Sequence, residues 1–165
     1  MKHARLLATL LLVVFGLTVT TASRRSRASS NEEGGAEGQQ APVEYSSAKS
    51  TASRPFSDVV RVGNILYLSG KLGTDSSGKL APGGITAETK QALENIKAVL
   101  AANGSSLDNV VKSTVMLADM KEWADMNSVY TTVFKKDRMP ARSAFGVTGL
   151  ALNARVEIEC IATLK

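Results

Sequence analysis

The segment covering residues 155–163 alternates between apolar and polar side chains, and this alternation limits the folds that are open to the chain. Two carboxylates, Glu157 and Glu159, stand among its apolar members. The apolar members are Val156, Ile158, Cys160 and Ala162. Successive side chains of a strand point to opposite faces, so the pattern predicts a strand with one buried face. Such a strand requires a sheet that other elements cover on one side only.

Four further runs of β-branched and apolar residues predict strands. They cover residues 59–62, 65–68, 110–117 and 143–147. Gly63-Asn64, between the first two, predicts a tight hairpin turn. Residues 71–84 contain the turn-forming runs Asp75-Ser76-Ser77-Gly78 and Pro82-Gly83-Gly84 and are predicted to form a solvated loop.

Two segments with apolar residues at helical spacing predict helices. The first is expected to begin with Thr86 as its cap, with Glu88 in its first turn, and to stop at Asn103-Gly104. The second is expected to follow a capping box of Asp119 and Glu122. Its apolar stripe is typical of a core-facing helix and consists of Trp123, Met126, Tyr130, Val133 and Phe134.

The order strand, strand, helix, strand, helix, strand, strand predicts an α+β fold with a sheet. If both helices pack on one face of the sheet, the other face meets solvent or another subunit. We therefore expect an oligomer.

The first third of the chain is predicted to lie outside the folded domain. Residues 1–23 resemble a targeting leader, with a basic start, an apolar run too short for a typical membrane span, and small residues at its end. Cleavage and export, to the periplasm or the exterior, are favoured. Import into a mitochondrion or plastid is the alternative, because residues 24–30 are basic and rich in serine. Residues 24–53 have few large apolar side chains and predict a disordered linker, which leaves 54–165 as the domain.

Charge and histidine content exclude several functions. The net charge is +5, but five basic residues precede the first acidic residue, Glu32, so the domain itself has no dense basic run. No nucleic-acid partner is expected, and no membrane contact after leader removal. The single histidine is His3, in the leader, which leaves the domain without imidazole for metal ligation or Ser-His chemistry. Cys160 is expected to be a buried, inert thiol.

Arg142 and Glu157 are the candidate catalytic pair. An arginine two residues after Pro140 can grip a carboxylate or phosphate at two points, and a glutamate on the next strand can hold or deprotonate water. A structural alternative is that Arg142 only forms an ion pair with Glu157 or Glu159. Ser69-Gly70 either lets a ligand approach the backbone closely or simply ends a strand. The purely structural interpretation of Asn127 is that its side chain makes a hydrogen bond within the fold.

Several motifs resemble the reactive intermediate deaminase family, also called the YjgF-like (RidA) family. The matching segments are Pro55-Phe56, Ser69-Gly70, residues 91–100, residues 110–115, the Met-Asn-x-x-Tyr motif at 126–130, the Pro-Ala-Arg-Ser motif at 140–143 and the Val-Glu-Ile-Glu motif within 156–162. The match runs from about residue 55 to residue 164 in one register.

The resemblance implies a chorismate-mutase-like α+β fold and a homotrimer with sites in clefts between neighbouring subunits. It implies hydrolysis of 2-imino and enamine acids, such as 2-iminobutanoate and 2-iminopropanoate, to 2-keto acids and ammonia, without a cofactor or metal. By the same resemblance, Arg142 grips the substrate carboxylate and Glu157 positions the attacking water. Phe56, Ser69, Gly70 and Asn127 match positions that line or support the cleft.

The chain departs from the family pattern at three places. Phe56 replaces a common tyrosine, Ala144 replaces a common cysteine, and Lys71-Leu72-Gly73 replaces a more usual Gln-Ile-Pro, so substrate preference is expected to differ. Two other functions stay open: a non-catalytic binding or chaperone-like protein of the same fold, and a ribonuclease.

Overall fold

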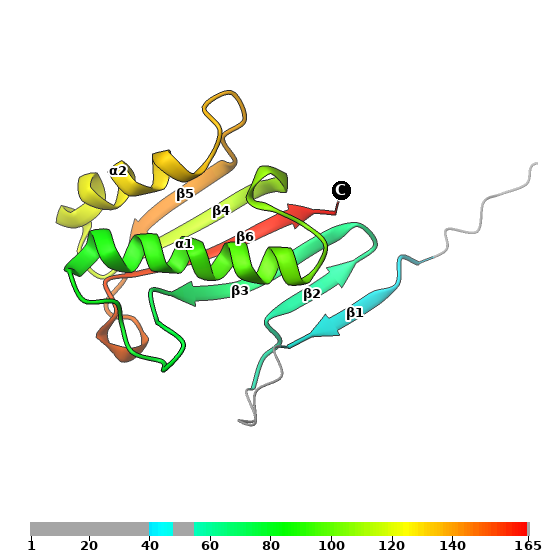
Figure 1. Ribbon diagram of the computed structural model, residues 1–165, viewed down its shortest axis with the longest axis horizontal. Coiled ribbons are helices and arrows are strands. Elements are labelled where there is room, and N and C mark those ends of the chain that lie inside the picture. The colour runs from blue at the N-terminus through cyan, green and yellow to red at the C-terminus, as the bar shows by residue number, and fades with distance from the viewer. Residues whose placement is uncertain (1–39, 48–54, 165) are drawn as a thin grey trace, which may run out of the picture. The chain divides into compact units, whose positions relative to one another are not determined.

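The computed structural model describes residues 40–47 and 55–164, which form a six-stranded sheet and two helices (Figure 1). The strands are β1 (Val43–Ser46), β2 (Val59–Val62), β3 (Ile65–Leu72), β4 (Val110–Leu117), β5 (Ala141–Gly146) and β6 (Val156–Thr163). The helices are α1 (Gly84–Ala102) and α2 (Trp123–Val133). Short 3-10 turns are η1 (Leu107–Asn109), η2 (Met120–Glu122) and η3 (Ala151–Asn153).

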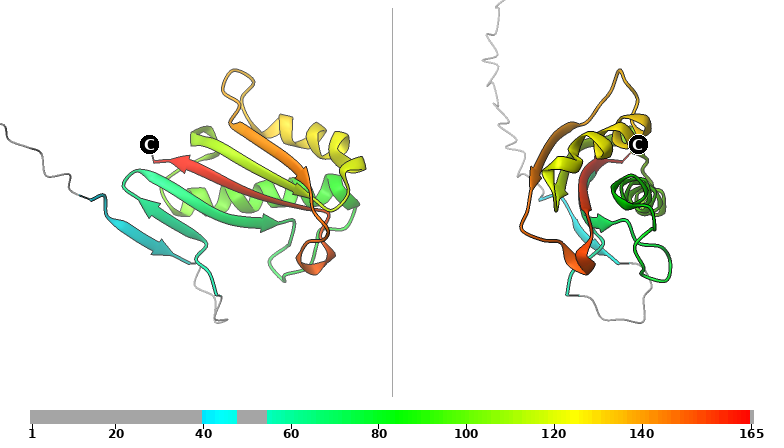
Figure 2. Two further views of the ribbon diagram at one scale, coloured as in Figure 1. Left: turned by 180° about the vertical axis from the view of Figure 1, so that it is seen from behind. Right: turned by 90° about the vertical axis from the view of Figure 1, so that its left-hand side faces the viewer.

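The strand order is β1-β2-β3-β6-β4-β5, and both helices cover one face of this mixed sheet (Figure 1, Figure 2). Only β4 and β5 run parallel, because α2 carries the chain back between them; the other neighbouring pairs are antiparallel. The expected α+β class is therefore confirmed.

The alternation along β6 builds the core, as expected. Its four apolar residues are at most 2% exposed and pack with side chains from α1 and α2 such as Leu93, Ile96 and Met126. The opposite face of the sheet carries no helix, and Tyr67 on it is 44% exposed.

The start of α1 differs from the expected one, and only half of the expected capping box before α2 is present. α1 begins at Gly84, because Gly83 and Gly84 adopt positive φ angles of 118° and 72° that start the helix before Thr86. Asp119 does cap its turn, by accepting a hydrogen bond from the Lys121 backbone N–H at 2.9 Å. Glu122 does not complete a capping box, because its carboxylate pairs with Arg155 instead.

The predicted linker at 24–53 contains one strand, which corrects that expectation in part. β1 pairs with β2 through the backbone, and all four of its side chains are exposed, so its formation needs no buried apolar residue. Residues 1–39 and 48–54, including the expected leader, lie outside the described residues. Neither helix in the described part of the chain is long and apolar enough to cross a membrane.

Candidate active site

A bulge in β3 shapes the surroundings of Glu157. Between the pairs Leu68–Cys160 and Lys71–Ile158, β3 advances three residues while β6 advances two, so Ser69-Gly70 contains one extra residue. β3 therefore does not end at Leu68, as the sequence suggested, but continues to Leu72. The Ser69 hydroxyl donates to the Ser57 carbonyl at 2.6 Å, which ties the bulge to the segment before β2.

The carboxylate of Glu157 lies directly over Gly70. A Cβ atom added at Gly70 would stand 2.1 Å from Glu157 Oε1 and 2.8 Å from its carboxyl carbon. Only glycine therefore leaves room for this side-chain position. The strand-end interpretation of Ser69-Gly70 is wrong, because β3 continues to Leu72, and the missing side chain of Gly70 makes room for Glu157; ligand binding at this position stays a prediction.

Burial raises the pKa of the Glu157 carboxyl, and the charge of nearby Glu159 raises it further. A carboxylate with a raised pKa is a better proton acceptor at neutral pH than an ordinary one. The position and basicity of Glu157 thus suit a group that activates water.

Gly70→Ala is expected to push the Glu157 carboxylate aside and to lower kcat/KM about 10- to 100-fold. The melting temperature should change little, because the obstructing atoms belong to the end of a flexible side chain and the backbone of Gly70 is compatible with alanine. Gly149→Ala is the matched control, since nothing lies within 4 Å of its added Cβ. Equal kinetics in the two variants would contradict this role of Gly70.

Glu159→Gln is expected to move the acid limb of the kcat/KM profile to lower pH. Activity needs ionised Glu157 and falls as pH drops through its pKa, and the Glu159 charge raises that pKa. Removing the charge lowers the pKa, so activity persists at lower pH. The exposed Glu94→Gln on α1 is the control, and an acid limb that stays in place or moves upward in Glu159→Gln would refute the assignment.

Arg142 lies on the edge strand β5, two strands away from β6. Its guanidinium carbon is 4.5 Å from the centre of the Tyr130 ring and 5.8 Å from that of Trp123. Its Nη1 atom is buried, and among the described residues it has no hydrogen-bond partner. Arg142 also forms no ion pair with Glu157 or Glu159, so the purely structural alternative is wrong within one chain.

One chain does not bring Arg142 and Glu157 together. β4 separates their strands, and Ser113 and Cys160 occupy the register positions level with Arg142. Arg142 packs against α2 on the helix-covered face, whereas Glu157 alternates with buried Val156 and Ile158 and so faces the open side.

The candidate residues therefore fall into two separate groups, which we name the glutamate half-site and the arginine half-site. The glutamate half-site consists of Glu157, Gly70, Ser69 and Phe56. The arginine half-site consists of Arg142, Tyr130, Trp123 and Asn127. Asn127 belongs to the second because it lies one helical turn from both aromatic residues on α2.

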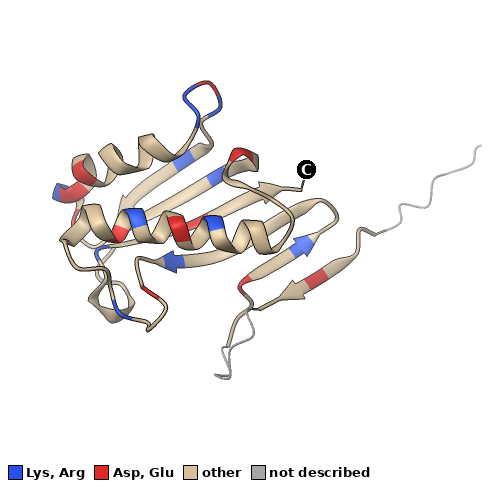
Figure 3. Cartoon of the chain, viewed as in Figure 1, with Lys and Arg blue, Asp and Glu red and all other residues tan. Residues whose placement is uncertain are grey.

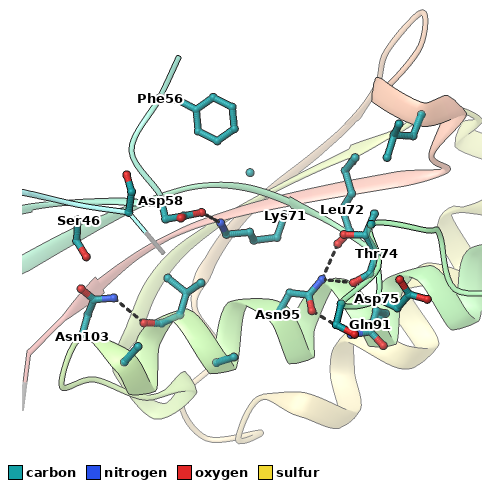
Figure 4. A pocket seen from close by; sticks show the side chains of 18 residues that line it. Ser46, Phe56, Asp58, Lys71, Leu72, Thr74, Asp75, Gln91, Asn95 and Asn103 are labelled. Atoms are coloured by element: carbon teal, nitrogen blue, oxygen red, sulfur yellow. Dashed lines mark hydrogen bonds and ion pairs between the residues drawn. The ribbon is translucent and has the colours of Figure 1, made fainter. Parts of the chain in front are cut away.

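An open cavity of about 820 Å³ lies beside the glutamate half-site (Figure 4). Phe56 and Gly70 are among the residues that line it, and Lys71 points into it and pairs with the buried carboxylate of Asp58. On the α1 side, Asn95 donates to the carbonyls of Leu72 and Thr74 at 2.9 Å each. The sequence marked Lys71 only as a departure from the family pattern and gave no sign of this cavity.

No cluster of three or more His, Cys, Asp or Glu side chains that could hold a metal ion occurs in the described ranges.

The family model described as Endoribonuclease L-PSP matches residues 46–164. The chain belongs to this family. It is the YjgF-like, RidA family of the resemblance, which is thereby confirmed.

Proteins with similar sequences have names that belong to the same family. A mouse protein called 2-iminobutanoate/2-iminopropanoate deaminase is 48% identical over 109 residues, covering 66% of this chain and 80% of the relative. An Arabidopsis thaliana protein called Reactive Intermediate Deaminase A, chloroplastic, is 40% identical and covers 67% of this chain and 59% of the relative. A Saccharomyces cerevisiae protein called MMF1, mitochondrial, is 41% identical, with coverage of 69% and 78%.

The fold agrees with solved structures of the family. The crystal structure of yeast Mmf1 superposes with a TM-score of 0.66 and 38% identity, covering 75% of this chain and 98% of that chain. The family fold is therefore shared beyond the local motifs.

The sequence did not predict that Tyr130 and Trp123 accompany Arg142. Their helical spacing was interpreted as a core stripe, which holds for Tyr130, at 2% exposure, but only partly for Trp123, at 38%. The Met-Asn-x-x-Tyr motif was the signal that could have linked α2 to Arg142.

Proposed function

We propose that the protein hydrolyses 2-imino acids and their enamine tautomers to 2-keto acids and ammonia, with 2-iminobutanoate and 2-iminopropanoate as substrates. The observation that carries the proposal is the buried, unpartnered nitrogen of Arg142, which offers a charged N–H to an anion. Relatives at 44–48% identity that are named 2-iminobutanoate/2-iminopropanoate deaminase point to the same substrates.

The reaction needs one water molecule and one base. Arg142 holds the substrate carboxylate, while Glu157 accepts a proton from water as the water oxygen bonds to the imine carbon. The electron pair of the C=N bond moves to the nitrogen, which is protonated in the bound iminium form, so that a neutral aminoalcohol results. Glu157 then returns its proton to this nitrogen, the C–N bond breaks to release ammonia, and the hydroxyl gives its proton to Glu157 as the C=O bond forms. Such imines already hydrolyse in water, so orientation and one general base, worth about 100- to 10,000-fold, can suffice.

The two half-sites are proposed to meet between subunits of a homotrimer. β5 is an edge strand, and large apolar side chains are exposed near Arg142: Met120 and Phe145 at 45% each and Trp123 at 38%. Exposed apolar groups of this kind mark interaction surfaces. A second copy placed there would bring its Glu157 to Arg142 of the first and complete each site.

The proposal is tested by adding the purified protein to a threonine or serine dehydratase reaction, which releases these imines. Keto-acid and ammonia release should accelerate in proportion to the amount of protein. A protein that leaves both rates unchanged while still binding the keto acid would be a binding protein of the same fold. The raised pKa of Glu157 favours the enzyme over that alternative.

A ribonuclease, which the family description suggests, has less support. Histidine is absent from residues 4–165, and Lys and Arg alternate with Asp and Glu along α1 rather than forming a stripe (Figure 3). We do not propose a nucleic-acid substrate.

The leader is proposed to direct import into an organelle. Relatives named as mitochondrial and chloroplastic support this alternative, whereas the relatives give no support to export, which the apolar run had favoured. Imaging the full-length protein with a fluorescent tag at residue 165 distinguishes an organelle from secretion.

A further inference from the structure

We infer that Tyr130 and Trp123 form an aromatic seat that fixes the Arg142 guanidinium for carboxylate binding, and that Tyr130 is a positioning residue of the site. The substrate in this inference is taken from the proposed function. The arrangement of Arg142 between the two rings does not depend on it. Nothing in the resemblance or the comparisons assigns a role to either ring.

The first argument is the way in which Arg142 is held. At 4.5 Å from its ring centre, Tyr130 lies within the range of a cation–π interaction, and Trp123 at 5.8 Å reaches the limit of that range. Among the described residues no carboxylate pairs with Arg142. The ring faces are therefore its main electrostatic support, and its N–H groups stay available for a ligand.

The second argument is the rigidity of Tyr130. Its ring packs against Phe134 with centres 4.8 Å apart, and only 2% of the residue is exposed. Arg142, Tyr130 and Phe134 thus form a continuous row of contacts that ends in the core. A guanidinium on such a support loses less conformational freedom when it binds a carboxylate at two points.

The third argument is that Tyr130 acts through its ring face. Burial raises the pKa of the phenol, so the group is neutral at physiological pH and offers no negative charge to Arg142. Its hydroxyl is buried beside the buried hydroxyl of Ser113, and the interaction with Ser113 lowers the pKa of the phenol less than burial raises it. The neutral ring keeps the arginine charge uncompensated, which favours an incoming anion.

The test measures the affinity for 2-oxobutanoate, the expected product, by calorimetry. Trp123 is the only tryptophan in the chain, so its fluorescence reports binding independently wherever it is retained. Tyr130→Leu is expected to weaken binding about 5- to 30-fold, and Tyr130→Phe to restore most of the affinity. In the dehydratase-coupled assay KM should rise with little change in kcat, because the carboxylate is held in both ground and transition states.

Tyr45→Leu is the matched control, because Tyr45 on β1 is 73% exposed and touches neither half-site. If Tyr130→Leu fails to fold, Trp123→Leu at the exposed end of the seat replaces it, with an expected loss of about 2- to 5-fold by calorimetry. The inference is wrong if Tyr130→Leu binds 2-oxobutanoate as tightly as Tyr45→Leu does. The same holds for Trp123→Leu where it replaces Tyr130→Leu. A wild-type protein that does not bind 2-oxobutanoate would also overturn the inference.

The experiment separates this inference from the proposed function. A wild-type protein that binds the keto acid through Arg142 and the two rings, but does not accelerate imine hydrolysis, retains the aromatic seat and refutes the deaminase. A protein that accelerates hydrolysis but binds equally well without the Tyr130 ring refutes the seat alone.

Discussion

Arg142→Ala is expected to lower kcat/KM about 100- to 1,000-fold in the dehydratase-coupled assay. Two charge-assisted hydrogen bonds to the substrate carboxylate are lost, each worth about 1.5–3 kcal/mol, part of which water recovers. Arg142→Lys should recover little of the activity, because an ammonium cannot reproduce the planar two-point contact or lie flat on Tyr130. The measurement is the rate of keto-acid release at limiting enzyme.

The melting temperature of Arg142→Ala should not fall together with its activity. Arg142 has a buried nitrogen without a partner among the described residues, so removing its charge is not expected to lower the melting temperature. Arg138→Ala is the matched control, since Arg138 is exposed in the turn before β5. If Arg142→Ala is as active as Arg138→Ala, the deaminase assignment is wrong. Arg142 would have a structural role if its loss instead unfolded the protein.

The sequence predicted the elements whose periodicity is local. Val156 through Ala162 alternate on a strand, and the stripe on α2 repeats at helical spacing, so their buried faces follow from the chain itself. Motif matches then located Arg142 and Glu157 without showing how they are arranged. For Glu157 the face of the sheet was also predictable, because it alternates with buried neighbours.

Other features depend on contacts that a linear pattern does not encode. β1 is held by backbone pairing with β2 and has four exposed residues, so its composition resembled that of a linker. The extra residue at Ser69-Gly70 appears only when β3 is registered against β6. Arg142 packs against α2, which is part of the connection between β4 and β5. The short strand β5 that carries Arg142 has no clear alternation of buried and exposed side chains.

Because the two half-sites are separate in one chain, we expect two inactive variants to restore activity when their subunits assemble together. Arg142→Ala leaves Glu157 intact, and Glu157→Gln leaves Arg142 intact but removes the general base, which should cost about 100- to 10,000-fold alone. Each variant should therefore be nearly inactive. Unfolding the two together in equal amounts and refolding them produces mixed trimers.

If each site takes its arginine from one subunit and its glutamate from the neighbour, some mixed sites contain both native residues. Random assembly of a ring gives such a pairing at about one site in four, so the mixture should recover about a quarter of the wild-type activity. Sedimentation must show trimers. The same variants mixed without unfolding should stay inactive, as should Arg142→Ala/Glu157→Gln refolded alone.

Recovery is the outcome that a site within one chain cannot produce, because every chain in the mixture lacks one of the two groups. The geometry of the single chain motivates this expectation, because Arg142 and Glu157 lie on opposite faces of the sheet with β4 between their strands. A refolded trimer that stays inactive would mean that the two half-sites do not meet across subunits. In that case the cavity beside Phe56, Gly70 and Lys71 would become the place to look for the substrate, without help from Arg142.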